Sequence, residues 1–465
     1  MLKTSVQQLV LLLNRVPFAL YITRLPYYAA VQACQKLMAR HPLIKAAYAR
    51  NSFALGTWVP GRSDIDLTVS WNRPFPEEKA GGVAELEALK QWWSDYEKLQ
   101  RLYPMLGEVE VICTEHLLAS TRFGITGFEA RQWLPIYGSD EMQSGYCGEA
   151  RQQAKDRFVY ALGVYHHQMR GVVKSASQIT LQRYVKKILR YLDQPVDQDT
   201  ERRLRSLSVI DLEVLAIQSL SKRAIATVAE IRKASQPVCL QTLLENKNIN
   251  EVDFSELPLP ISHPILEISN QPELAENLIS IFPASNYRNK VYYLVKDSIS
   301  DDDLKIYLST LKGRAEDAVV LPESLFICLF YQVDILEYLA LANRRKILFG
   351  IDPFTNWPSL PQSILNNAVG ISAAYIFSVP YQLGIHEMSE QTFTNFLFGW
   401  ILRLGRFLED GVMDFDYARL HQYWQEKHPE LSRDLHLLNQ GKVDRFSFLC
   451  RINEYINQGL LSLNT

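Results

Sequence analysis

Apolar positions near the start of the chain recur first with the spacing of a helix and then with that of a strand. Helical spacing over Val6–Arg40 predicts two helical stretches that break near Pro26. The segments that follow predict the order strand, turn, strand, helix, strand, over Leu43–Ala49, Ile65–Ser70, Gly82–Leu102 and Val109–Cys113. This order indicates a small sheet in the first third of the chain.

The rest of the chain has mainly helical periodicity. The pattern is helical from Glu129 to Gln236, and the Pro-containing stretch Leu240–Pro264 indicates a linker. Beyond the linker, Val291–Lys296 predicts a strand, and Ser300 with Asp303 predicts a capped start of a helix. Further helices are predicted at Leu325–Leu341, Thr392–Leu408 and Tyr417–Lys427. No internal repeat is evident in the sequence.

These patterns predict an α+β fold in several parts. The parts are a basic N-terminal helical segment (1–42), a sheet-containing domain (43–125), a basic helical domain (126–236), a linker (237–265) and a mostly helical C-terminal domain (266–465). A length of 465 residues is consistent with two or three domains.

Charge is balanced over the whole chain but not locally. The 49 Lys and Arg against 51 Asp and Glu give a net charge of −2, which argues against a nonspecific nucleic-acid binder. Residues 151–235 carry 16 basic and 8 acidic residues, whereas residues 236–465 carry 18 basic and 28 acidic ones. A basic helical domain beside an acidic site suits a polyphosphate substrate.

The sequence also bears on location. The six cysteines never form a CxxC pair, which favours a reducing cytoplasm, and no apolar stretch is long enough to predict a transmembrane segment. The first 50 residues contain seven basic residues and no acidic one. We interpret them as a solvated basic helix face, with docking on an anionic membrane surface as the alternative.

Candidate chemistry begins where the first predicted strand ends. Asp64 and Asp66 are two residues apart on an extended segment, so both carboxylates leave the same face. Adjacent carboxylates repel each other and need a counter-cation, and oxygen ligands favour Mg²⁺. A third carboxylate is expected from a neighbouring strand, where Glu108 and Glu110 are the candidates and Glu110 is favoured.

This pattern resembles the nucleotidyltransferase fold of the DNA polymerase beta superfamily. That family's signature is a Gly-Ser turn, a second Gly, Asp-x-Asp on a strand and a third acid on a later strand. Ser52, Gly56, Asp64 and Asp66 match it in type and spacing, whereas Asn51 stands where the family has Gly. Asn is the non-Gly residue that best tolerates positive φ. The resemblance covers residues 40–120 and implies a small mixed-sheet catalytic domain followed by helices.

The resemblance implies an enzyme that moves an NMP group from an NTP, with ATP expected, to an acceptor hydroxyl and releases pyrophosphate. Two Mg²⁺ ions, or Mn²⁺, would be held by Asp64, Asp66 and Glu110. Nucleotide binding would involve Asn51, Ser52 and Gly56, together with a helix resembling Leu181–Tyr191, which offers Lys186 or Lys187. A small molecule or a protein is favoured over RNA as acceptor, because the C-terminal part is acidic. The alternative is a catalytically silent nucleotide-binding or interaction module.

Overall fold

The computed structural model describes residues 10–462 with internal gaps. The residues left out within that range are 11, 14–15, 74–80, 123–128, 140–141, 143–149, 171–176, 234–236, 239–271, 284–290, 313–317, 335–346, 355–359, 387–388, 390–392, 395 and 411–416. The predicted linker Leu240–Pro264 and the end of the predicted helix Leu325–Leu341 therefore lie outside the described residues. The chain divides into two compact units, one of residues 1–147 with 370–465 and the other of residues 148–369.

The first unit is built on a four-stranded mixed sheet with the strand order β3-β2-β1-β4. Its strands are β1 (Ile44–Ala49), β2 (Ile65–Trp71), β3 (Leu106–Cys113) and β4 (Leu134–Gly138). β1 is antiparallel to β2 and β4, whereas β2 and β3 are parallel. A parallel pair needs a long crossover, which α4 (Gly81–Leu102) provides. The predicted α+β class and its first three strands are confirmed.

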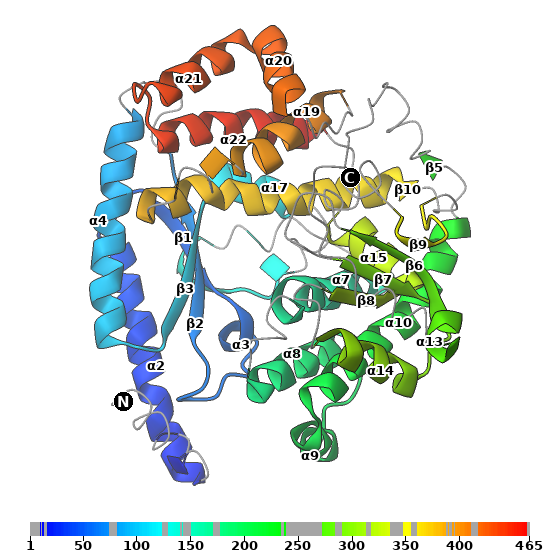
Figure 1. Cartoon of the computed structure of the whole chain (residues 1–465). Helices are drawn as coiled ribbons and strands as arrows, with labels where there is room; N and C mark the ends of the chain where they lie inside the picture. The colour runs from blue at the N-terminus through cyan, green and yellow to red at the C-terminus, as the bar shows by residue number, and fades with distance from the viewer. Residues whose placement is uncertain are drawn as a thin grey trace. The chain divides into compact units, whose positions relative to one another are not determined.

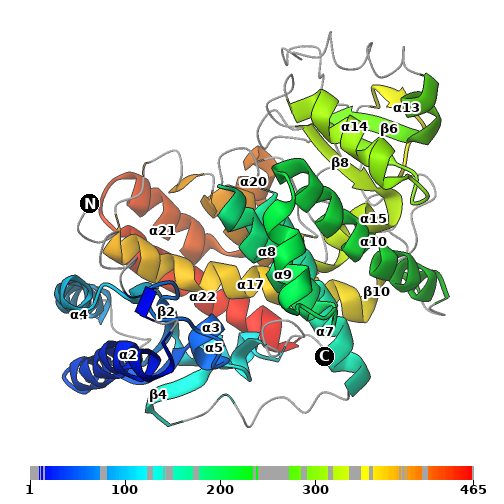
Figure 2. The ribbon, with the colours of Figure 1, turned by 90° about the horizontal axis from the view of Figure 1, so that it is seen from below.

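One face of this sheet is covered by α2 (Pro17–Met38) and α4, which lie side by side (Figures 1 and 2). The buried positions of α2 recur at helical spacing, and they are Thr23, Tyr27, Ala30, Cys34, Leu37 and Met38. The same core takes in fully buried side chains of α4 and inward-facing residues of β2, namely Leu89, Trp92, Tyr96, Ile65, Leu67 and Val69.

The predicted helix break at Pro26 is wrong. α2 continues through Pro26, which is exposed. Proline removes one backbone N–H and crowds the preceding turn. The helix persists because its residues are buried on both sides of Pro26, Thr23 before it and Tyr27, which packs in the core of the first unit, after it.

The C-terminal helices from Gly370 onward belong to the first unit, so the range 266–465 is shared between the two units. These helices are α17 (Gln362–Ile385), the π-helix η3 (Leu397–Ile401), α19 (Leu402–Asp410), α20 (Tyr417–Lys427), α21 (Pro429–Asn439) and α22 (Arg445–Ser462). α22 packs on α4 and on α5 (Thr114–Ser120). Among the helices that the structure describes, none is both long and apolar enough to cross a membrane.

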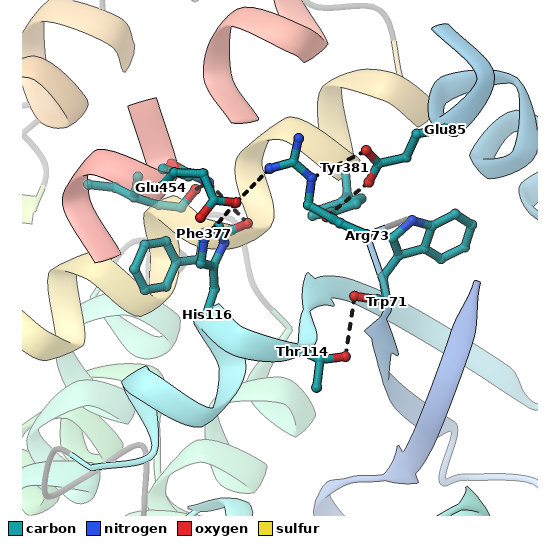
Figure 3. A network of polar contacts seen from close by, with 10 residues as sticks. Trp71, Arg73, Glu85, Thr114, His116, Phe377, Tyr381 and Glu454 are labelled. Carbon is teal, nitrogen blue, oxygen red and sulfur yellow. Dashed lines mark hydrogen bonds and ion pairs between the residues drawn. The ribbon is translucent and has the colours of Figure 1, made fainter. Parts of the chain in front are cut away.

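A buried polar network joins the C-terminal helices to the far end of β2 (Figure 3). Arg73, which follows β2, donates to Glu85 of α4 at 3.3 Å and to Glu454 of α22 at 2.6 Å. The hydroxyl of Tyr381 on α17 donates to Glu85 at 3.4 Å, and His116 on α5 lies 3.6 Å from the Glu454 carboxylate. Side chains from four helices, α4, α5, α17 and α22, are therefore held at one point beside the sheet.

The second unit begins with a group of helices. They are α7 (Ala150–Gly163), the π-helix η1 (Val164–Met169), α8 (Gln178–Tyr191), α9 (Gln198–Ser206) and α10 (Val209–Lys233). α8 packs against α7 and α10. The predicted helical character of this part of the chain is confirmed, although β4 interrupts the start of the predicted range.

A second four-stranded sheet follows, with the order β8-β7-β6-β9. Its strands are β6 (Leu278–Pro283), β7 (Val291–Val295), β8 (Ala318–Pro322) and β9 (Phe349–Gly350). Around it lie α13 (Pro272–Asn277), α14 (Asp301–Lys312) and α15 (Glu323–Gln332), while β5 (Pro237–Val238) pairs separately with β10 (Leu360–Pro361). The predicted cap of α14 is confirmed, because the backbone N of Asp303 donates to Ser300 Oγ at 3.1 Å.

The second sheet repeats the plan of the first. β6, β7, β8 and β9 take the places of β1, β2, β3 and β4, with the same order and the same parallel and antiparallel pairings. In each sheet a helix connects the parallel pair, α4 or α14, and another helix begins directly after the third strand, α5 or α15. The register shift also recurs at the same place, between residues 44 and 46 and between residues 278 and 280.

The fourth strand of each sheet carries a glycine at the equivalent position. Gly138 has φ +76°, and a Cβ there would lie 2.1 Å from the carbonyl oxygen of Lys45. Gly350 has φ +80°, and a Cβ there would lie 2.0 Å from the carbonyl oxygen of Ile279. Only glycine fits either position, since both the conformation and the close approach exclude a side chain.

Candidate functional site

The carboxylates predicted to carry chemistry lie on one face of the first sheet. On β2, Ile65 and Leu67 face the core, so Asp66 and Thr68 point to the opposite face. Thr68 pairs with Glu110 of β3. Glu108 and Glu110 therefore share the face of Asp66, while Val109 between them is buried in the core. This face lies at the edge where β2 and β3 begin and β1 ends.

Asp64 and Asp66 are both accessible at this edge. Asp64 is exposed just before β2, and Asp66 is half-buried at its start. The Asp66 carboxylate is held from two sides, because Oδ2 accepts from Asn51 Nδ2 at 2.9 Å and Oδ1 accepts from the backbone N of Glu108 at 3.2 Å. These hydrogen bonds fix the Asp66 carboxylate beside the first residues of β3.

Gly107 permits this close packing. A Cβ added at Gly107 would lie 2.4 Å from Asp66 Oδ1 and 3.0 Å from Asp64 Cβ. The β2–β3 register also shifts here, so that β3 has one extra residue opposite Asp66. The sequence analysis missed Gly107 because the predicted strand, Val109–Cys113, begins two residues after it, whereas β3 begins at Leu106.

The turn after β1 contains two residues with positive φ. Asn51 has φ +55°, in the left-handed region, and Gly56 has φ +67°. Asn51 stands at the position where the family that the motif resembles has Gly. Asn51 begins the short helix α3 (Asn51–Ala54) and contributes the amide that contacts Asp66. Ser52 follows it, half-buried, and its carbonyl accepts from the backbone N of Thr57 at 3.0 Å. The positive φ at Asn51 explains why asparagine is tolerated at this position.

The loop from α3 to β2 is anchored on α2. The hydroxyl of Tyr27 donates to the carbonyl of Ser63 at 2.8 Å and accepts from the backbone N of Gly61 at 3.0 Å. Trp58 packs against the rings of Tyr27 and Phe53, with centroids 4.7 and 5.2 Å apart. Burial, and to a lesser degree the charge of Asp64, raises the pKa of Tyr27, so its hydroxyl stays protonated. Asp64 therefore lies on a loop whose backbone is fixed to α2 by hydrogen bonds to Tyr27.

The preferred third acid, Glu110, is paired with a cation. Arg50 Nη1 donates to Glu110 Oε2 at 2.6 Å, and the two side chains are 17% and 25% exposed. Desolvation raises the pKa of Glu110, and the like charge of Glu108 adds to this effect, whereas Arg50 and a hydrogen bond from Ser378 oppose it. Arg50 was not predicted as part of the site, because its partner is 60 positions away in the sequence.

The donor atoms at this sheet edge determine which metal ion the site suits. Asp64 and Asp66 offer carboxylate oxygens, the donor type that a hard divalent cation prefers. Among the described residues, no three His, Cys, Asp or Glu side chains are gathered closely enough to hold a metal. The two aspartates therefore fit such an ion by donor chemistry, and Glu110 is turned to Arg50 in this conformation.

The two lysines expected to bind phosphate lie on α8 in the second unit. Lys186 Nζ donates to Glu201 Oε1 of α9 at 2.8 Å, and this hydrogen bond lowers the pKa of Glu201. Lys187 Nζ lies 5.0 Å from the centre of the Tyr160 ring. Both lysines are half-buried. Their role toward phosphate stays a prediction.

Comparison with known proteins adds no relative. No protein-family model, curated protein or solved structure matches the chain. The resemblance to nucleotidyltransferases therefore rests on the sequence motif alone.

Proposed function

We propose that the chain is a Mg²⁺-dependent nucleotidyltransferase that moves an NMP group from an NTP, with ATP favoured, to an acceptor hydroxyl. The observation that carries this proposal is that acidic residues on one face of the sheet lie at the same sheet edge as a left-handed turn. Asp66, Glu108 and Glu110 share a face there, and Asn51 contacts Asp66 directly.

The reaction is an in-line displacement. The acceptor oxygen forms a bond to the α-phosphorus, the bond from that phosphorus to the bridging oxygen breaks, and pyrophosphate leaves. Asp64 and Asp66 would hold Mg²⁺, with Glu110 completing the set. When bound, the ion neutralises the triphosphate and lowers the pKa of the acceptor hydroxyl. The Ser52 hydroxyl donates to a β- or γ-phosphate oxygen, and Lys186 or Lys187 contributes positive charge.

The acceptor class follows from charge. The C-terminal range 236–465 carries 18 basic and 28 acidic residues. An acidic surface repels a nucleic-acid backbone, so a small molecule, especially a cationic one, or a protein is favoured over RNA. We place the reaction in the cytoplasm, where free thiols such as the buried Cys34 and Cys113 persist.

Label transfer tests the activity. The purified protein is incubated with each α-³²P-labelled NTP, Mg²⁺ or Mn²⁺, and host lysate separated into small-molecule, RNA and protein fractions. We expect label in one fraction with the unmutated protein and none with Asp64→Asn/Asp66→Asn. Asp199→Asn, an 85% exposed aspartate on α9, is the matched control and should retain full transfer. Equal labelling by all three proteins would refute the proposal.

The Arg50–Glu110 ion pair favours a second candidate, a nucleotide-binding module without turnover, because it occupies the third carboxylate. Calorimetry with Mg²⁺ and ATP separates the two functions. Binding that is lost in Asp64→Ala, combined with no pyrophosphate from any acceptor fraction, would favour the silent module over the enzyme.

A further inference from the structure

Arg50 occupies a central position among the residues of the candidate site. It is the residue before Asn51, and its backbone N donates to the carbonyl oxygen of Asp66 at 2.8 Å. Its side chain crosses to the third strand and reaches Glu110. One residue thereby links the turn after β1, the Asp-x-Asp strand and the strand of the third acid.

The contact between Arg50 and Glu110 is short and involves a single nitrogen of the guanidinium group. A single guanidinium nitrogen, Nη1, meets Glu110 Oε2 at 2.6 Å. Arg50 Nε is buried and has no hydrogen-bond partner among the described residues. Glu108 faces Glu110 with a like charge, and Ser378 of α17 supplies the other hydrogen bond to it. Arg50 is therefore the main positive charge that holds Glu110 in its present orientation.

We propose that Arg50 is a positioning residue that holds Glu110 away from Asp64 and Asp66 and so competes with a divalent cation for the third carboxylate. This inference rests on the proposed function, because it concerns the same metal site. The structure supports it through two facts: the acids share one face, yet no three of the described acids are gathered as a metal site while Glu110 contacts Arg50.

The expected size of the effect follows from the exposure of the pair. Partly exposed ion pairs contribute up to about the free energy that corresponds to a fivefold change in an equilibrium constant. Removing Arg50 should therefore tighten metal binding by up to about fivefold, since Glu110 no longer has to leave a cation first. A bidentate, fully buried pair would give a larger change.

The experiment measures Mn²⁺ binding without nucleotide, by electron paramagnetic resonance of free Mn²⁺ or by calorimetry. The variants are Arg50→Met, Arg50→Lys, Glu110→Gln and the Arg50→Met/Glu110→Gln double variant. Circular dichroism checks that each is folded, and Arg50→Gln replaces Arg50→Met if that variant does not fold. The unmutated chain, Arg50→Met, Glu110→Gln and the double variant form a double-mutant cycle for the pair, and Arg50→Lys is the charge-conserving control.

The expected result is tighter Mn²⁺ binding in Arg50→Met, binding near the unmutated value in Arg50→Lys, and no gain from Arg50→Met when Glu110 is already Gln. Unchanged or weaker binding in Arg50→Met would overturn the inference. A gain that persists in the Glu110→Gln background would also overturn it, because simple removal of positive charge then explains the effect. If none of the proteins bound Mn²⁺, the inference would likewise be overturned.

The outcome is separable from that of the proposed function. Mn²⁺ affinity is measured without nucleotide or acceptor, so the cycle can succeed while label transfer fails. In that case the chain has a metal site governed by Arg50 but is not a transferase. If label is transferred but Mn²⁺ affinity is the same across the cycle, the chain is a nucleotidyltransferase in which Arg50 does not control metal binding.

Discussion

At the scale of single residues, Gly107 shows how a position without a side chain shapes the site. Its Cα lies beside both aspartates, and the space that a methyl group would need is taken by Asp66 Oδ1. Because the Asp66 carboxylate is the end of a flexible side chain, it can move aside at low cost to the fold. Its hydrogen bonds to Asn51 and to the Glu108 amide would then be disturbed.

We therefore predict that Gly107→Ala impairs function far more than stability. Nucleotidyl transfer should fall by at least about tenfold, as small misplacements of catalytic groups do, while the melting temperature changes by only a few degrees. The matched control is Gly163→Ala at the end of α7, where a Cβ meets no atom within 4 Å. That control should be neutral or slightly stabilising in thermal unfolding. Full transfer by Gly107→Ala would contradict the prediction.

The residues of the candidate site differ in how far the sequence could reveal them. Asp64, Asp66 and the turn residue Asn51 stand within a short segment, so their spacing alone predicts their proximity. Arg50 and Gly107 act through partners that are far away in the sequence. Their roles depend on strand register, which a pattern of apolar residues does not specify.

At the scale of elements, the network around Arg73 determines how the C-terminal helices attach to the first unit (Figure 3). The Arg73 and Glu85 side chains are 14% and 3% exposed, so the pair is largely withdrawn from water. Burial raises the pKa of Glu85, and Arg73 counteracts this effect. Removing the cation alone would leave a buried carboxylate without its main counter-charge.

We predict that Arg73→Met lowers the free energy of unfolding by about 3 kcal/mol, the usual cost of breaking a buried pair on one side. Urea unfolding followed by circular dichroism measures the loss. Lys98→Met is the control, because Lys98 is 65% exposed where it pairs with Asp95 on α4. That change should cost no more than about 0.5 kcal/mol. If both variants lost the same free energy of unfolding, the buried network would contribute no more to stability than an exposed ion pair.

A second polar cluster joins the C-terminal helices to one another. The Glu409 carboxylate of α19 accepts hydrogen bonds from the hydroxyls of Tyr423 on α20 and Tyr455 on α22, and lies 2.9 Å from His428 Nε2. Desolvation alone would raise the pKa of Glu409, but these hydrogen bonds and the charge of His428 lower it to about 2. The cluster thus stabilises the ionised carboxylate.

The sign of the resulting pH dependence follows from linkage. The folded pKa of Glu409 lies below the ordinary value of 4.5, so its stabilisation is present above about pH 4.5 and is lost as the pH falls toward 2. Glu409→Gln should lower stability at pH 7 and make it less sensitive to acid between pH 5 and about 3. Urea unfolding at several pH values tests this. The control Glu426→Gln, whose exposed carboxylate accepts from Gln422, should keep the acid sensitivity of the unmutated chain.

The elements themselves were predictable in proportion to their local pattern. The strands near 44–49 and 65–71 and the helix at 417–427 have clear periodicity, and the structure confirms them. β4 contains Pro135 and Gly138 and has no regular alternation of buried and exposed residues, so it was missed. Pro26 misled the prediction of α2, since tertiary packing outweighs the local cost of proline there.

At the scale of the whole molecule, the two units share one sheet plan but differ in what its second face carries. Thr68 and Glu110 of the first sheet correspond to Tyr292 and Val319 of the second, counted from the ends of the paired strands. Tyr292 is buried against the Phe282 ring, with centroids 5.6 Å apart. The sequence showed no repeat because the strands of the two sheets share few residue types. The two sheets are alike in strand pairing and register instead.

The polar face of the first sheet is therefore an aromatic core in the second. Phe326 of α15 lies 5.6 Å from Phe282 and 5.8 Å from Tyr292, ring centre to ring centre. At these described positions of the second sheet, packed rings and Val319 stand where the first sheet has Thr68 and Glu110. Of the two sheets, the first is the one whose described residues keep the chemistry of the proposed site.

We accordingly predict one nucleotide site per chain. Calorimetry with a non-hydrolysable ATP analogue and Mg²⁺ should give a stoichiometry of one, and Asp64→Asn/Asp66→Asn should abolish the binding altogether, because the described strands of the second sheet carry Tyr292 and Val319 where the first sheet has Thr68 and Glu110. Asp302→Asn at the start of α14, 91% exposed, is the control and should bind as the unmutated chain does. A stoichiometry of two, or binding that survives the loss of both aspartates, would mean that the second sheet also holds nucleotide, through contacts other than carboxylates on its strands.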